Sequence, residues 1–144
     1  MCRKINKLFE KLYILCYDKG KYRGWNMTEL ETIQRTRANM PDMKKVKITA
    51  MRKMCYPDLM EKYENPIEHA CDVEEGQVWV AIDGQKPEGL CDSAWESMAA
   101  FVKILAEGGG NFYDGWMKNP YSAMISCNDG FRPVSFYLET LNEE

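Results

Sequence analysis

The strongest constraint on the fold of this chain is one amphipathic pattern in its second half. Between residues 93 and 107, apolar side chains recur at every third or fourth position, as they do on one face of a helix. The members of this pattern are Trp95, Met98, Ala99, Val102, Leu105 and Ala106. Ser93 and Glu96 have the spacing of an N-terminal capping box, and Gly108 follows as a stop signal. A helix with one apolar face must pack against another layer of structure.

Short segments with strand-like alternation provide that second layer. The candidate strands are residues 46–51, Gln77–Ile82, Tyr121–Cys127 and Pro133–Leu141. The last two are separated by an Asn-Asp-Gly turn signal, which predicts an antiparallel hairpin. We therefore predict an α+β fold, a two-layer domain with a mainly antiparallel sheet and one principal helix over about residues 93–107. Pro57 also predicts a short helix over Asp58–Glu64.

The sequence before Pro41 has a different character. We predict two parts, a basic helical extension over residues 1–42 and an α+β domain over residues 43–144. In residues 1–26, seven Lys and Arg residues stand against two acidic ones. This extension is a candidate docking surface for a protein partner or for a second copy of the chain. The net charge of −3 argues against a nucleic-acid partner.

The expected location of the protein and the expected state of its cysteines both rest on sequence signals that we do not find. We recognise neither an apolar run of the length that a membrane helix needs nor a convincing signal peptide, so we expect a cytoplasmic protein without a membrane partner. The chain has six cysteines without tight pairing in sequence. In a reducing compartment they are expected to be free thiols.

Three of these thiols lie at the ends of predicted elements, where sites are often built. Cys71 precedes a turn, Cys91 precedes the principal helix, and Cys127 ends a strand. With His69 they could ligate a metal such as zinc or iron, although the Cys-x-x-Cys pairs of strong zinc motifs are absent. Alternatively, Cys91 or Cys127 could be a nucleophile, and for Cys91 the positive end of the following helix would favour a thiolate. A third interpretation is that all three only pack in the core.

Two further features could contribute to a ligand site. Arg132 could clamp a carboxylate or phosphate with two hydrogen bonds while Asp129 orients it, or it could pair with a carboxylate of its own domain. Trp116 lies in irregular sequence between Gly115 and Pro120, and is the best aromatic candidate for contact with a bound small molecule.

Several of these residues belong to motifs that carry a family resemblance. The motifs are Met43-Lys-Lys-Val-Lys-Ile-Thr49, Cys71 ahead of Glu75-Gly76, Pro87-Glu-Gly-Leu-Cys91-Asp-Ser-Ala-Trp95, Trp116-Met-Lys118 and Cys127-Asn-Asp-Gly-Phe-Arg-Pro-Val134-Ser-Phe136. On these motifs, about 100 of the 144 residues resemble an uncharacterised prokaryotic, bacterial family of small proteins. The resemblance implies one domain from Met43 but no reaction. Asp72 and Ser126 depart from it, standing where proline and a second cysteine are expected.

Three functions are therefore open. The leading hypothesis is a domain that binds a small molecule or a metal near Cys91, Cys127 and Arg132. The second is a thiol-dependent enzyme that uses Cys91 or Cys127. The third is an interaction or accessory subunit that docks through residues 1–42.

Overall fold

The computed structural model describes residues 42–142 and, further upstream, Thr28, Glu31, Thr32 and Arg35. The chain divides into two units, Met1–Met40 and Pro41–Glu144, and the account below concerns the second. The predicted basic extension lies outside the described residues apart from those four positions and Asp42. Within the described part, no helix combines the length and apolar character needed to cross a membrane.

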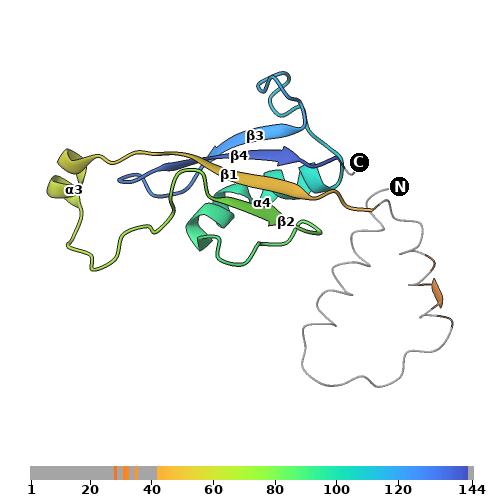
Figure 1. Ribbon diagram of the computed structural model, residues 1–144, viewed down its shortest axis with the longest axis horizontal. Coiled ribbons are helices and arrows are strands. Elements are labelled where there is room, and N and C mark those ends of the chain that lie inside the picture. Colours follow the sequence, from red (N-terminus) through yellow and green to blue (C-terminus); the bar gives the residue numbers. More distant parts are fainter. Residues whose placement is uncertain (1–27, 29–30, 33–34, 36–41, 143–144) are drawn as a thin grey trace. The chain divides into compact units, whose positions relative to one another are not determined.

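The second unit contains one antiparallel sheet and two helices (Figure 1). Its elements are β1 (Val46–Lys53), α3 (Pro57–Tyr63), β2 (Val78–Ala81), α4 (Asp92–Ala106), β3 (Ser122–Ser126) and β4 (Val134–Thr140). The strand order is β2-β1-β4-β3, and every neighbouring pair is antiparallel. The predicted α+β fold is confirmed, as is the hairpin formed by β3 and β4.

The core lies between the sheet and α4. Alternate residues of the strands, including Ile48, Phe136 and Leu138, are buried on one face of the sheet. Met98 and Leu105 of α4 are fully buried against them. Burial of each such side chain contributes about 1.5–3 kcal/mol. The domain therefore gains its stability from two layers, as the helical and alternating patterns predict.

The start of α4 differs from the prediction. Its N-cap residue is Cys91, and Ser93 is already the second residue of the helix, so the predicted capping box is wrong. No side chain caps this end of the helix. Leu90 and Trp95 occupy the two positions of a hydrophobic staple; Leu90 is buried in the core cluster and Trp95 is half-buried against it. The helix thus begins at Asp92 without a polar cap, with apolar side chains packed at the core on both sides of its first residue.

The end of α4 agrees with the prediction. The last helical residue is Ala106, and Gly108 follows with a φ of 84°. Its N–H donates to the carbonyl oxygen of Leu105. A positive φ at this position suits glycine, which has no Cβ to clash with the backbone.

Between β1 and β2 the chain leaves the sheet and returns (Figure 1). The N–H groups of Met54 and Tyr56 donate to the carbonyl oxygens of Pro133 and Phe131, at 2.9 Å each, and extend the pairing beyond the ends of β1 and β4. The short helix α3 follows, one residue earlier at each end than predicted. We refer to residues 54–70 as the arm. In Figure 1 the arm carries α3 beyond the end of the sheet.

Candidate functional site

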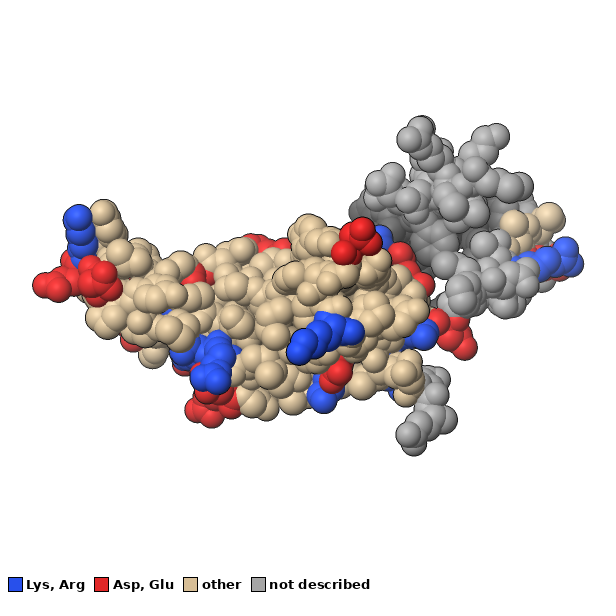
Figure 2. Space-filling model, turned by 90° about the horizontal axis from the view of Figure 1, so that it is seen from above, with Lys and Arg blue, Asp and Glu red and all other residues tan. Residues whose placement is uncertain are grey.

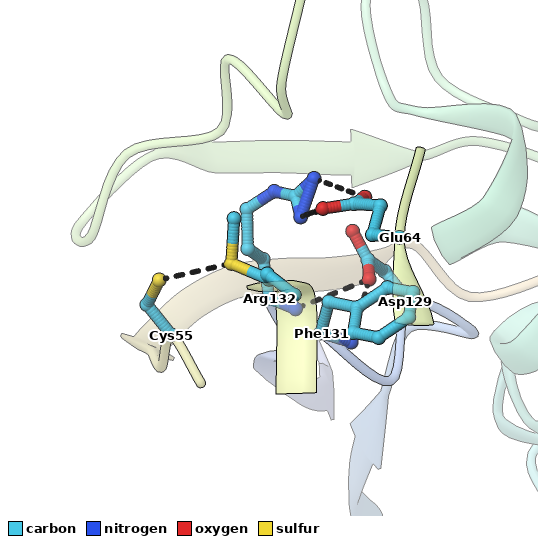
Figure 3. Close-up of polar contacts among 6 residues, drawn as sticks. Cys55, Glu64, Asp129, Phe131 and Arg132 are labelled. Carbon is cyan, nitrogen blue, oxygen red and sulfur yellow. Dashed lines mark hydrogen bonds and ion pairs between the residues drawn. The ribbon is translucent and has the colours of Figure 1, made fainter. Parts of the chain in front are cut away.

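The turn between β3 and β4 lies at the base of the arm. One carboxylate oxygen of Asp129 accepts hydrogen bonds from the backbone N–H groups of Phe131, at 2.8 Å, and Arg132, at 3.1 Å (Figure 3). This closed turn is typical of aspartate, whose side chain can replace a backbone acceptor. Asp129 therefore fixes the backbone from which the Arg132 side chain extends.

Arg132 is buried and paired with a carboxylate of the arm. It is 6% exposed, and its guanidinium faces Glu64, the residue that ends α3 (Figure 3). Nη1 donates to both Glu64 oxygens at 3.1 Å, and Nη2 donates to Oε1 at 2.5 Å. Two-point contacts of this kind are the strong form of the arginine–carboxylate pair. Of the two predicted roles for Arg132, pairing within its own domain is the one observed.

Lys53 holds the returning end of the arm to β1. Its Nζ donates to the carbonyl oxygens of Cys71, at 2.7 Å, and Val73, at 3.1 Å. Its backbone N–H donates to a carboxylate oxygen of Glu75 at 2.9 Å. The arm is therefore anchored at its start by backbone pairing, at the end of α3 by an ion pair, and at its return by Lys53.

The structure brings together only part of the predicted thiol site. Cys127 is half-buried, and its Sγ accepts a hydrogen bond from the N–H of Val134 at 3.3 Å. The next residue, Asn128, donates to the carbonyl oxygen of Ser93 at 3.3 Å, which places this turn beside the first turn of α4. Cys91 is exposed at the start of that helix.

The remaining predicted metal ligands do not complete a cluster. Cys71 is half-buried against the core, and His69 is exposed. Among the residues that the structure describes, no three His, Cys, Asp or Glu side chains are grouped so that they could hold a metal ion. The zinc or iron site proposed for Cys71, Cys91, Cys127 and His69 thus receives no support from the geometry.

Trp116 lies away from Arg132. It is 44% exposed and stacks edge to face on the exposed Tyr113, with ring centroids 5.3 Å apart. Both belong to the loop before β3, whereas the Asp129–Arg132 turn follows the other end of that strand. The aromatic candidate and the arginine candidate therefore do not line one site.

Sequence reasoning missed two side-chain contacts made by residues of the arm. Glu64 pairs with Arg132 across 68 positions of sequence, and no local pattern joins the two. The Sγ of Cys55 lies 3.6 Å from the Sδ of Met60, a contact across the start of α3 (Figure 3). A carboxylate at the end of a short helix and a Cys-x4-Met spacing are too common in sequences to identify either contact.

Comparisons with family models, with curated proteins and with solved structures find no match for this chain. The family resemblance based on the motifs stays a prediction, and function has to be inferred from the geometry.

Proposed function

We propose that this chain is an interaction protein that assembles with a second copy of itself through the outer surface of the arm. The observation that carries the proposal is a contrast within α3. A buried ion pair fixes the end of this helix, yet none of its own residues is buried. The anchor orders a helix whose side chains contribute little to the core of its own domain.

A helix as short as α3 depends on packing contacts with other parts of a protein. Isolated helices of seven residues are unstable in water, and short helices in proteins depend on tertiary contacts of an apolar face. The arm exposes large apolar side chains instead, by 37% to 66% of their surface. They are Met54, Tyr56, Leu59, Tyr63 and Ile67. Exposed apolar groups gathered on one element are typical of interaction surfaces.

The helical spacing places part of this set on one side of α3. Leu59 and Tyr63 are four residues apart on α3, and Tyr56 is the residue that caps its start; we call these three side chains the arm stripe. Met60 and Glu64, the half-buried positions, face the domain. The arm stripe is therefore available to another molecule without displacing the anchor.

Charge favours a second copy as that molecule. Asp58 and Lys62 are one helical turn apart on one flank of α3, and both are exposed. When two such helices pack antiparallel about a two-fold axis, each Asp58 faces Lys62 of the other copy. Figure 2 agrees with this mixed character, because side chains of both signs gather at the α3 end, beside a broad surface without charged groups.

Sedimentation velocity of the full-length protein over a range of concentrations tests the proposal. We expect a reversible monomer–dimer equilibrium that Leu59→Ser and Tyr63→Ser each weaken at least tenfold, because both changes remove apolar contact area. Ile104→Ser is the matched control, since Ile104 is 43% exposed on α4 but lies outside the arm. A monomer at all concentrations, or equal effects of the three substitutions, would contradict the proposal.

Charge reversal tests whether the partner is a second copy of this chain. Asp58→Lys and Lys62→Asp should each weaken association of the identical chains, because each creates like charges across the two-fold axis. Mixing the two variants should restore association, because every pair then has opposite signs. If the mixture associates no better than either variant alone, the antiparallel arrangement is wrong.

A further inference from the structure

We infer that Tyr113, Asp114 and Trp116 form a binding site for a quaternary ammonium group, such as the head group of choline or the end of a trimethylated lysine side chain. This inference is independent of the proposed self-association. The three residues belong to the loop between α4 and β3, residues 107–121, which extends beyond β3 in Figure 1. This loop presents two exposed aromatic rings, nearly at right angles, and an exposed acidic residue between them in sequence.

The geometry of the two rings suits a single cation. Their centroids are 5.3 Å apart, and their planes are inclined by 77°. Tyr113 is 76% exposed and Trp116 is 44% exposed, so a ligand can reach both rings from solvent. A cation is attracted to an aromatic face at distances up to about 6 Å from the ring centroid. Because the two centroids are closer together than this distance, one cation can interact with both rings at once.

The backbone that carries the rings has an unusual conformation. Asn111, Tyr113 and Asp114 have φ angles of 50°, 51° and 52°, in the left-handed region. Asparagine and aspartate tolerate this region, but a residue as large as tyrosine rarely adopts it. The side chain of Tyr113 is exposed, so packing in the core does not explain its conformation. Strained positions of this kind concentrate at sites that hold a ligand.

Contacts at the base of the loop maintain this conformation. The N–H of Asn111 donates to the carbonyl oxygen of Pro120 at 2.6 Å, which closes the base. The side-chain oxygen of Asn111 accepts a hydrogen bond from the N–H of Gly115 at 3.0 Å. Phe112 packs on Phe101 of α4, with ring centroids 4.9 Å apart. The two exposed rings are therefore positioned before binding, which reduces the entropy that binding costs.

The chemistry of the loop selects a methylated cation. An aromatic face attracts positive charge but offers no strong hydrogen-bond acceptor, so it suits a cation that carries methyl groups in place of N–H donors. The methyl groups also bury apolar surface against the rings. Asp114 is exposed beside Tyr113 in sequence, and its carboxylate adds a negative charge to the same loop.

An NMR titration of the full-length protein with choline tests the site through the indole N–H signal of Trp116 and the backbone N–H signal of Gly115. We expect saturable shifts of both signals. Tyr113→Asn removes one ring but keeps a residue type that tolerates a positive φ, and it should weaken binding at least about tenfold. Trp116→Ala should weaken binding by a similar factor, measured through Gly115.

Substitution of the charged residues of the loop tests the electrostatic part of the inference. Asp114→Asn should weaken choline binding about threefold, because it removes an exposed charge and keeps the shape of the side chain. Lys118→Ala is the matched control, since it removes an exposed charge of the opposite sign from the same loop and should not weaken binding. Equal losses in the two variants would contradict the inference. The dispersion of the remaining NMR signals checks that each variant is folded.

Two further ligands separate charge from shape and identify the source of the cation. The neutral analogue of choline, with carbon in place of nitrogen, should bind at least about tenfold more weakly. Equal binding of the two would overturn the inference, as would unchanged signals of Trp116 and Gly115 with every ligand. A peptide with one trimethylated lysine separates the two sources. Tighter binding of this peptide than of choline assigns the site to a methylated protein, and the reverse order assigns it to a small molecule.

Discussion

Helices α3 and α4 belong to the same domain but stand in opposite relations to its core. α4 has fifteen residues, and five of them are buried against the sheet. α3 has seven residues, and none is buried. Both helices are fixed in place, α4 by apolar packing along its length and α3 by hydrogen bonds at its two ends. The difference shows that α4 contributes to the core, whereas α3 is fixed only at its two ends; the proposed function gives this exposed helix its role as a docking surface.

Replacing one leucine by alanine in each helix tests whether the two helices differ in their contribution to stability. Leu105→Ala should lower the free energy of unfolding by about 3 kcal/mol, because it leaves a cavity under the sheet where Leu105 is fully buried. Leu59→Ala should cost less than about 0.5 kcal/mol in the monomer, because this side chain is 39% exposed. Urea denaturation at low protein concentration measures both values. Similar losses in the two variants would mean that α3 belongs to the core.

Removal of the Arg132–Glu64 ion pair should destabilise α3 without affecting α4. Glu64→Ala leaves the buried guanidinium of Arg132 without its partner, which should cost about 2–3 kcal/mol in the stability of the arm. Glu61→Ala is the control on the same helix, because Glu61 is exposed and should cost less than about 0.5 kcal/mol.

Amide hydrogen exchange locates the effect of these two substitutions. Faster exchange over α3 in Glu64→Ala, with α4 unchanged, is the expected pattern. Unchanged exchange over α3 would show that the Arg132–Glu64 pair does not hold the arm.

The elements of the core were predictable because their signals are local and repeated. The apolar period of α4 and the alternation in β4 each extend over several turns or pairs of residues, so an error at one position has little effect. The start of α4 was less predictable. Ser93 and Glu96 have the right spacing for a cap, but the helix begins at Asp92, after Cys91 and the buried Leu90, and burial cannot be inferred from spacing.

The candidate site was predictable only in part. An Asn-Asp-Gly sequence favours a turn, and an arginine next to it favours pairing with a carboxylate, so Asp129 and Arg132 could be singled out. The identity of that carboxylate depends on how the arm folds back. Glu64 ends a helix with no buried residue of its own, so no apolar pattern in the sequence indicates where it lies.

The most direct test of the account is amide hydrogen exchange of α3 in the unmodified, full-length protein at several protein concentrations. We predict that protection over Leu59–Glu64 rises with concentration, while protection over α4 stays constant, because self-association covers the arm but not the core. Protection over α3 that does not change from dilute to concentrated protein would contradict the claim that the arm is the docking surface.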